Sequence, residues 1–387
     1  MNYIGSKYSL LNKITRIIED FDIPKGGIVL DLFSGTGIVS QLFKSMGYIT
    51  YANDWQYYSY CLSASFLLFN DFPVFNKLLN TEEGKLIKNV DKENIKILCL
   101  NNRIYKPNNK SFIKVLEYLQ NLKGKKGKFY DFYCEGGTEG RLYFSKDNGK
   151  KIQAIRDKIE DWHRYNFISY NEKTWLIACL LESADRVANT ASVYGAYLKK
   201  IKKSAEKTIE LTGIKPVASR IKPNLNKVFC KDALEILKLL KNRDIALAYL
   251  DPPYNHRQYS ANYHILETIA KWDINDFLPR GVTGLRNSKE LNSYYSLRSR
   301  AEESYRKLFL NLNSKYILLS YNNEGLISEK FIRNLFEEYC SSYKFEKIEY
   351  IRFRADTDHP HRNYKTDRTI EYLIIGAMKN KSLNQKI

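Results

Sequence analysis

An apolar run that ends in two glycines, residues 28–37 (IVLDLFSGTG), constrains the fold more than any other feature of the chain. Apolar residues with helical spacing follow over residues 38–46, and residues 48–53 (YITYAN) then have the composition of a second strand. An aromatic-rich helix is expected from about residue 55 to residue 70. Strands and helices that alternate in this way favour a parallel sheet covered by helices. The sequence therefore predicts an α/β fold with a doubly wound, Rossmann-like sheet.

The alternation of strands and helices stops near residue 73 and resumes near residue 226. Between these points the chain has Lys/Asn-rich segments and few strand signals, with long helical patterns around 149–162 and 173–210. After the interruption we expect a strand at 226–230, a helix at 232–241, strands at 245–250 and 316–321, a helix at 327–340, and closing strands near 344–353 and 369–377. The predicted organisation is a catalytic domain made of residues 1–72 and 226–387, interrupted by a basic, mostly helical region at 73–225.

Positive charge is concentrated in the inserted region. The 387 residues include 62 Lys and Arg against 43 Asp and Glu, a net charge of +19. Residues 73–225 alone hold 30 basic and 17 acidic residues, a net +13. An AT-rich genome would explain many of the lysines but not their concentration in one region. A localised basic region favours a polyanionic partner such as nucleic acid.

Cysteine spacing and hydropathy exclude several classes of protein. The six cysteines are far apart in the sequence, and none forms the CxxC spacing of a metal or redox site. Charges interrupt the apolar residues of the N-terminus, which is unlike a secretory signal. No apolar run approaches the roughly 20 residues that a membrane span needs. We therefore expect a reduced, cytoplasmic protein with no membrane partner.

The glycine-rich strand exit predicts a nucleotide-like cofactor. Gly35 and Gly37 allow a tight turn and a close approach of the backbone to a ligand. A dinucleotide is disfavoured, because Ser40 replaces the third glycine and Asp31 would repel a pyrophosphate. A carboxylate there suits the ammonium group of S-adenosylmethionine. Asp54, at the end of the second strand, has the spacing of an acid that binds ribose hydroxyls. A purely structural turn is the alternative for the glycines alone.

The segment LAYLDPPY, residues 247–254, predicts a pocket for a planar amine. Two prolines lack N–H groups, so the carbonyl of Pro252 can point outward without a partner in the strand. Asp251 offers carboxylate oxygens beside it, and Tyr254 supplies a flat ring. Two acceptors and a stacking face suit the exocyclic amine of adenine. The alternative is an ordinary Asp-Pro turn at the end of a strand.

Three motifs in this order, NYIGSK at residues 2–7, DLFSGTG at 31–37 and DPPY at 251–254, resemble those of the alpha-group adenine-N6 DNA methyltransferases, the Dam-like enzymes. The segments ANTASVYGAYLKK, NHRQYSANYHILETIA and SYNNEG further resemble the FokI-type modification methylases of restriction systems. The resemblance covers most of the chain and is weakest between about residues 73 and 150.

The resemblance implies roles for individual residues. Carried over residue by residue, it gives as cofactor-binding Tyr3, Gly5, Ser6, Lys7, Asp31, Phe33, Ser34, Gly35, Thr36, Gly37, Asn53, Asp54, Asp232 and Ala233, and as catalytic Asp251, Pro252, Pro253 and Tyr254. Relatives often have glycine where Lys231 precedes Asp232, which weakens the assignment of Asp232. No metal ligand set is visible.

The resemblance also implies a function. We expect a site-specific DNA adenine methyltransferase that acts on a flipped-out adenine in double-stranded DNA, as the modification component of a restriction–modification system. Residues 73–225 would form the target-recognition region. No nuclease motif is evident, so a cognate restriction endonuclease would be a separate chain.

Several further residues are candidates for substrate binding. Asn255, His256, Arg257, Tyr259 and Tyr263 follow the DPPY motif and would line the channel for the flipped base, although ordinary loop roles remain open. Lys199, Lys200, Lys202 and Lys203 would contact phosphates or form a solvated face. His359, His361 and Arg362 are weaker candidates for phosphate contact.

Three rival functions remain open from the sequence. RNA adenine methylation would use the same pocket. A protein-glutamine methyltransferase also presents a planar amide to such a loop, but those enzymes typically have Asn in place of Asp251 and lack the N-terminal motif. An inactive DNA-binding module is the third, although each motif residue is intact.

Overall fold

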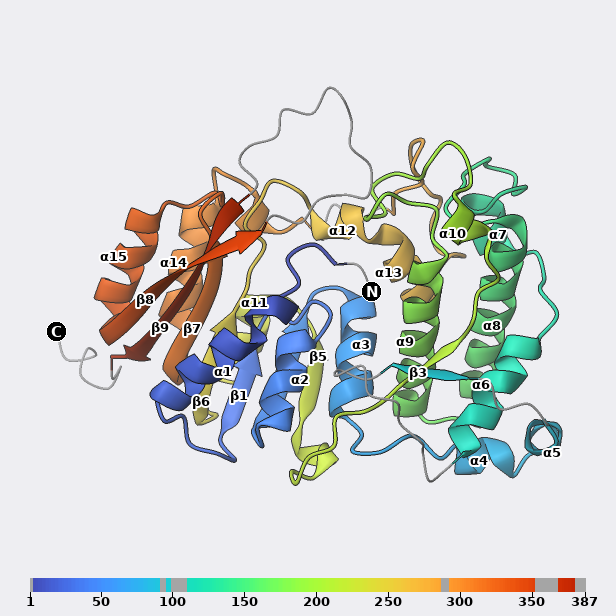
Figure 1. Cartoon of the computed structure of the whole chain (residues 1–387), viewed down its shortest axis with the longest axis horizontal. Coiled ribbons are helices and arrows are strands. Elements are labelled where there is room, and N and C mark those ends of the chain that lie inside the picture. The colour runs from blue at the N-terminus through green and yellow to red at the C-terminus, as the bar shows by residue number, and fades with distance from the viewer. Residues whose placement is uncertain (1–2, 91–94, 99–109, 287–291, 352–367, 380–387) are drawn as a thin grey trace. The chain divides into compact units, whose positions relative to one another are not determined.

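The computed structural model of the chain describes residues 3–90, 95–98, 110–286, 292–351 and 368–379 (Figure 1). The chain divides into two compact units, each described by itself. The sheet unit comprises residues 5–55, 219–259 and 290–387, and the helical unit comprises residues 1–4, 56–218 and 260–289. In the described ranges, no helix combines the length and the apolar character needed to cross a membrane.

A seven-stranded mixed sheet forms the sheet unit. Its strands are β1 (Ile28–Asp31), β2 (Ile49–Asp54), β5 (Lys227–Cys230), β6 (Ile245–Leu250), β7 (Ser314–Asn322), β8 (Cys340–Ile351) and β9 (Arg368–Met378). They lie in the order β5-β2-β1-β6-β7-β9-β8 (Figure 1). The first five are parallel, and β9 runs antiparallel to both of its neighbours. This confirms the α/β sheet that the sequence predicts, and every predicted strand of this unit is present.

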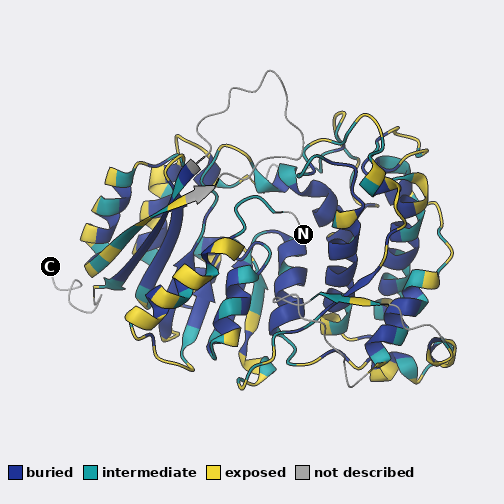
Figure 2. Ribbon diagram, in the orientation of Figure 1, coloured by how far each residue is buried: buried dark blue, intermediate teal, exposed yellow. Residues whose placement is uncertain are grey.

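Helices cover both faces of the sheet because the strand residues alternate between two apolar clusters. Leu30, Ala248 and Ile317 belong to one cluster, which includes residues of α11 (Ala233–Leu239), α14 (Ala301–Asn311) and α15 (Glu329–Tyr339). Val29 and Leu247 belong to the other cluster, together with α1 (Leu11–Asp20) and α2 (Ile38–Ser45). Short 3₁₀ turns are η1 (Tyr8–Leu10), η2 (Pro223–Leu225) and η4 (Tyr294–Ser296). The central strands are therefore buried on both sides, as Figure 2 shows.

The helical unit is built around α9 (Tyr170–Arg186), whose residues 174–184 are all buried (Figure 2). A capping box formed by Ser169 and Glu172 fixes its first turn. Helices α3 (Tyr57–Leu67), α8 (Lys146–Arg164) and α13 (His264–Lys271) pack around it. Smaller elements are α4 (Asn76–Leu79), α5 (Glu82–Lys88), β3 (Lys96–Leu98), α6 (Ser111–Asn121), α7 (Lys128–Tyr133), α10 (Lys203–Glu206) and β4 (Thr212–Ile214). The chain passes between the units at α12 (Tyr259–Asn262).

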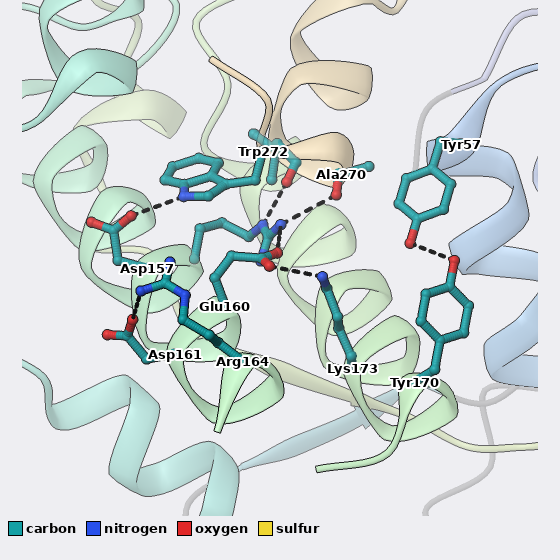
Figure 3. Close-up of polar contacts among 11 residues, drawn as sticks. Tyr57, Asp157, Glu160, Asp161, Arg164, Tyr170, Lys173, Ala270 and Trp272 are labelled. Atoms are coloured by element: carbon teal, nitrogen blue, oxygen red, sulfur yellow. Dashed lines mark hydrogen bonds and ion pairs between the residues drawn. The ribbon is translucent and has the colours of Figure 1, made fainter. Parts of the chain in front are cut away.

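A buried arginine joins three helices of the helical unit. Arg156 of α8 donates to the backbone carbonyls of Ile269 and Ala270, near the end of α13, at 2.6 and 3.2 Å. Its guanidinium also pairs with Glu160, which accepts from Lys173 of α9 at 2.8 Å (Figure 3). These hydrogen bonds and the ion pair offset the cost of burying the guanidinium charge. They also fix the backbone at the end of α13.

One expectation for residues 73–225 was wrong. The helix predicted at 173–210 ends at Arg186, and most of the remaining residues form a loop with the short helix α10. Asn189 directs this loop, because its side-chain amide bonds three backbone groups that a continuous helix would use differently. The parallel pair of β3 and β4 was also not predicted. The assignment of residues 73–225 to target recognition stays a prediction.

Candidate active site

The DLFSGTG and DPPY motifs meet where the order of the strands in the sheet reverses. From β1 the chain proceeds outward to β2 and β5, then returns to β6 on the other side of β1. Asp31, the last residue of β1, pairs with Tyr249 of β6, and Asp251 follows β6 directly. In open parallel sheets, ligands bind outside the carboxyl ends of the strands at such a reversal. Asp31 and Asp251 thus lie at the position where this fold class places its ligands.

The glycine-rich turn after β1 is bound to the end of β2. Gly35 and Gly37 have φ values of 51° and 74°, a region that favours glycine. The Gly35 N–H donates to an Asp54 carboxylate oxygen at 2.8 Å, and the Ser34 N–H donates to the Asn53 carbonyl at 2.8 Å. Asp54 therefore lies beside the glycine turn, at the end of β2. The turn leads directly into α2, with Gly37 as its N-cap.

Asp31 has one satisfied and one unsatisfied carboxylate oxygen. Its side chain is buried, and the Ser40 hydroxyl donates to Oδ2 at 2.5 Å. Among the described residues, none forms a hydrogen bond with Oδ1. Burial raises the pKa of Asp31 to about 7, although the bond from Ser40 acts in the opposite direction. A buried acceptor of this kind suits a cationic donor.

Asn53 and Asp232 have structural bonds in addition to their predicted roles. The Asn53 amide donates to the carbonyls of Leu32 and Lys231 at 3.2 and 3.1 Å and accepts from the Lys231 N–H. Asp232 caps α11 by accepting from the Leu234 N–H at 2.8 Å, and Ala233 is the buried first residue of that helix. Asn53 therefore connects the ends of β1 and β5, and Asp232 marks the end of β5.

An aromatic pair lies at this edge of the sheet, and the sequence reasoning missed one member of it, Tyr295. Phe33 packs edge-on against Tyr295, with ring centroids 5.3 Å apart. Burial raises the pKa of Tyr295, and the carboxylate of Asp232 raises it further. Tyr295 lies in η4, in a segment without a recognisable motif, so no signal in the sequence could have identified it. Phe33, Asp232 and Tyr295 together form one group beside the glycine turn.

Asp251 lies between buried charges of opposite sign. Lys7 Nζ is 3.1 Å from Asp251 Oδ1 and 4.0 Å from Glu371 Oε2. Burial raises the pKa of Asp251 to about 6; Lys7 lowers it and Glu371 raises it. Burial alone would lower the pKa of Lys7, but the carboxylates of Asp251 and Glu371 outweigh it and raise that pKa overall. Lys7 is therefore charged and bound to the predicted catalytic carboxylate.

Glu371 is the charged residue of the site that the sequence reasoning missed. It lies on β9, where it pairs with Asn322 of β7 and accepts from the Asn322 amide at 3.0 Å. Thr369 in turn donates to Asn322 at 3.2 Å. A single acid in the otherwise apolar segment EYLIIGAM was the available signal. It identifies a buried charge, which needs a buried partner.

The N-terminal motif lies against the DPPY motif. Gly5 has a φ of 79°, and a Cβ placed there would lie 3.4 Å from the Tyr259 hydroxyl and 3.6 Å from the Tyr254 hydroxyl. Lys7 Nζ lies 5.5 Å from the centre of the Tyr254 ring. Tyr321 also packs against Tyr254: the two rings meet edge-on, with their centroids 5.9 Å apart. Pro252 is buried, whereas Ser6, Thr36, Pro253 and Tyr254 are half-buried.

The residues after DPPY separate into exposed and buried positions. Asn255 closes a turn by accepting from the Arg257 N–H at 3.0 Å, and the side chains of His256 and Arg257 are exposed. Tyr263, in the helical unit, is fully buried. Its hydroxyl accepts from the Ile4 N–H at 2.8 Å, and its ring stacks on Tyr3 at 4.8 Å. The structure thus buries Tyr263 in the core of the helical unit, and its contact with substrate stays a prediction.

The remaining basic candidates belong to the helical unit or lie outside the described residues. Lys199 and Lys200 are exposed on the loop that follows α9, as is Lys203 at the start of α10. His359, His361 and Arg362 lie outside the residues that the structure describes.

Comparisons with known proteins identify the family of the chain. The family model of the D12 class N6 adenine-specific DNA methyltransferases matches residues 3–96 and 74–350. Type II methyltransferase M.NlaIII of Neisseria lactamica is 40% identical over 97% of this chain and 98% of its own length. Modification methylase StsI of Streptococcus sanguinis is 31% identical over 100% of this chain, and type II methyltransferase M.FokI of Planomicrobium okeanokoites is 30% identical over 92% of it.

The chain spans 54% of the StsI methylase and 50% of the FokI methylase, so each of these relatives has additional sequence. No solved structure matches the chain. The extent of the family match and the near full-length likeness to M.NlaIII decide the family. This protein belongs to the D12 class N6 adenine-specific DNA methyltransferases.

Proposed function

We propose that the protein transfers the methyl group of S-adenosylmethionine to the N6 amine of a flipped-out adenine at a specific site in double-stranded DNA. The placement of Asp251 beside Asp31 at the reversal point of the sheet carries this proposal. The Asp251 carboxylate suits the neutral amine of the target base, and the Asp31 carboxylate suits the cationic ammonium group of the cofactor. The family supplies the reaction, and these two acids supply its geometry.

The residues around Asp31 fit the cofactor. The unsatisfied oxygen Oδ1 of Asp31 would accept from the α-ammonium group, which removes the cost of a buried acceptor without a partner. Asp54, fixed at the glycine turn by Gly35, would accept from ribose hydroxyls. Phe33 and Tyr295 would border the adenine, with Asp232 at its amine. Bound there, the cofactor would present a sulfonium methyl group as the electrophile.

Asp251, Pro252 and Tyr254 would hold the target base. Adenine's amine is a weak nucleophile because its lone pair is delocalised into the ring. Acceptance of its two hydrogens by Asp251 and the carbonyl of Pro252 draws the nitrogen toward tetrahedral geometry and aims its lone pair at the methyl group. Stacking on Tyr254 would contribute roughly 1–3 kcal/mol, which offsets part of the cost of base flipping. Because Lys7 contacts Oδ1 of Asp251, it keeps the carboxylate ionised.

A methyl-transfer assay with matched variants tests the proposal. We expect Asp251→Ala to lower incorporation of tritiated methyl groups into duplex DNA by at least about a thousandfold, because alignment and electrostatic stabilisation are lost together. Binding of the product S-adenosylhomocysteine should stay within a few fold of wild type. Asp244→Ala, which changes an exposed acid of the sheet unit, is the control. Wild-type turnover by Asp251→Ala would contradict the assigned role.

Tyr254 has its own substitution series. If its ring acts by stacking, Tyr254→Phe should retain most of the activity and Tyr254→Ala should lose more of it. Equal activities of the two variants would exclude stacking as its contribution.

We further infer that the enzyme acts as the modification component of a restriction–modification system, with a separate endonuclease. The names of M.NlaIII, StsI and M.FokI, all type II methyltransferases or modification methylases, support this.

The basic region 73–225 would serve target recognition. The enzyme would be located in the cytoplasm, where DNA is accessible. Sequencing of methylated adenines in a host that expresses the gene would give the site. Transfer to RNA or to protein in place of DNA would overturn the proposal.

A further inference from the structure

A hairpin of the helical unit presents an apolar tip to solvent. Arg280 and Leu285 exchange two backbone hydrogen bonds of 2.8 Å, and Gly281 and Gly284 provide positive φ values of 66° and 69°. Val282 at the tip has 80% of its surface exposed. Leu278, just before the hairpin, has 77% exposed. These are the most exposed large apolar side chains among the described residues. A single exposed valine is ordinary on a protein surface. Here, however, a buried side chain forms hydrogen bonds with the backbone that carries the valine.

A buried arginine holds the backbone of the hairpin tip. The Arg141 side chain is almost fully buried, and it donates to the carbonyls of Gly281 and Val282, both at 3.0 Å. Its third bond goes to the Phe132 carbonyl at 2.9 Å. A Cβ at Gly284 would come within 2.8 Å of the Arg141 side chain, so this approach requires glycine. The chain therefore places a guanidinium, which is costly to bury, where it fixes an exposed turn.

One tyrosine joins the hairpin to a second surface loop. The Tyr143 hydroxyl lies 2.9 Å from the carbonyl oxygen of Thr283 in the hairpin and 3.1 Å from that of Tyr194. Tyr194 belongs to the loop of residues 187–202 that follows α9. The His264 ring nitrogen Nε2 also contacts Tyr194, at 2.9 Å, and burial lowers the pKa of this histidine to about 3, so it is neutral. The two loops thus share one buried hydroxyl, whose single hydrogen is available to either carbonyl.

The second loop is basic and equally well supported. The Asn189 amide donates to the carbonyls of Leu142 and Leu198 at 2.8 and 3.0 Å, and its oxygen accepts from the Lys202 N–H at 3.0 Å. Lys199 and Lys200 are exposed beyond this anchor, and the sequence has no Asp or Glu from residue 187 to residue 205. Three consecutive residues, 141–143, therefore position both the apolar hairpin and the basic loop.

We propose that the hairpin 280–285 and the loop 187–202 form one DNA-contacting surface, in which Val282 enters a groove of the duplex. The proposal rests on the DNA substrate and adds a hairpin that lies outside the predicted recognition region 73–225. A major groove admits a two-stranded ribbon, and an apolar tip suits thymine methyl groups or a base step. Arg280, Lys199 and Lys200 would contact phosphates. A stable protein interface would need a far larger apolar area than one valine and one leucine provide.

Substitutions at the tip with a matched control test the surface. The probe is a fluorescein-labelled duplex that carries the methylation site mapped in an expressing host. We expect Val282→Ala to weaken duplex binding about tenfold and Val282→Asp about a hundredfold, since the lost groove contact and the added charge each act on affinity. Leu86→Ala and Leu86→Asp change a residue of the same unit that is 63% exposed, and they should stay within about twofold of wild type. Affinity for S-adenosylhomocysteine should not change in any of the four.

The salt dependence separates the two parts of the surface. The double variant Lys199→Ala, Lys200→Ala should lower the slope of log affinity against log salt by about two, whereas Val282→Ala should leave the slope unchanged. Tyr143→Phe keeps both surfaces but removes the hydroxyl that joins them, and it should weaken duplex binding while Lys199 and Lys200 remain.

Equal duplex affinity of Val282→Asp and Leu86→Asp would overturn the proposal. A change of oligomeric state in Val282→Asp with DNA affinity intact would also overturn it, because that result would assign the hairpin to a protein contact. Either result, with methyl transfer to DNA by the wild-type enzyme retained, would leave the proposed function standing. Failure of the wild-type enzyme to methylate DNA would remove the function itself.

Discussion

At the scale of single residues, the site combines a buried carboxylate, Asp31, with a half-buried one, Asp251, and their surroundings differ. Among the described residues, Asp31 Oδ1 has no hydrogen-bond partner, whereas Asp251 contacts the charged Lys7. Both have a raised pKa, because burial disfavours the ionised form. A ligand that brings a cation to Asp31 and an amine to Asp251 would lower the cost of ionising both carboxylates.

Glu371 should tune the acid limb of the pH profile. It raises the pKa of Asp251, which burial places at about 6, and Lys7 lowers it. Glu371→Gln should therefore move the acid limb of kcat/KM for DNA to lower pH, and Lys7→Met should move it to higher pH, each by about one unit. The measurement is methyl transfer from pH 5 to 8 at saturating cofactor, with Glu338→Gln, an exposed acid of α15, as the control. Shifts in the same direction for both variants would contradict the arrangement.

Asp31 should make the ligand-free protein less stable as the pH rises. Its pKa in the folded protein is about 7 against an ordinary 3.8, so its contribution is full below pH 3.8 and is lost as the pH rises to 7. Asp31→Asn should then be more stable than wild type at pH 8, by about 2–4 kcal/mol, but equal to it near pH 4. Urea unfolding at both pH values measures this, with Asp244→Asn as a surface control. A constant difference between Asp31→Asn and wild type would refute the assignment.

At the scale of elements, the sequence predicts the sheet unit far better than the helical unit. The strands of the sheet unit are short apolar runs bounded by turns, so their periodicity and order are legible. The loop after α9 is not, because Ala188, Tyr194 and Leu198 continue a helical pattern while the Asn189 side chain replaces the helical bonds. Glu371 and Tyr295 were missed for a related reason. Their importance depends on strands and turns that come together only in the folded chain.

Asn189 should therefore hold its loop more strongly than a typical surface asparagine. Asn189→Ala would leave two carbonyls and one N–H without partners, which should cost about 3 kcal/mol of unfolding free energy. Asn311→Ala, which removes one exposed side-chain bond of α14, should cost less than about 0.5 kcal/mol. Urea unfolding compares the two, and faster hydrogen exchange of the Lys202 amide would localise the effect. Equal losses would show that the Asn189 bonds do not govern the loop.

At the scale of the whole molecule, the two units carry different chemistry. The sheet unit holds the predicted cofactor and catalytic residues from Gly5 to Tyr254, and the helical unit holds the Lys199–Lys200 loop and the 280–285 hairpin. The exception is Tyr3, which stacks on Tyr263 inside the helical unit. The proposed donor site and the proposed duplex-contacting surface thus belong to different units.

Hydrogen exchange with each ligand alone should resolve this division. S-adenosylhomocysteine should slow exchange at the glycine turn 32–40 and at the end of β2, because bound ligand would stabilise amides that the Asp54–Gly35 bond already orders. It should leave 187–202 and 280–285 unchanged. Duplex DNA should slow exchange in these two loops, and Val282→Asp should abolish that protection without affecting the response to S-adenosylhomocysteine. The Leu86→Asp variant should behave as wild type toward both ligands. Protection of the two loops by S-adenosylhomocysteine alone would mean that donor binding and duplex binding are not separated in this molecule, since one ligand would then order the surface assigned to the other.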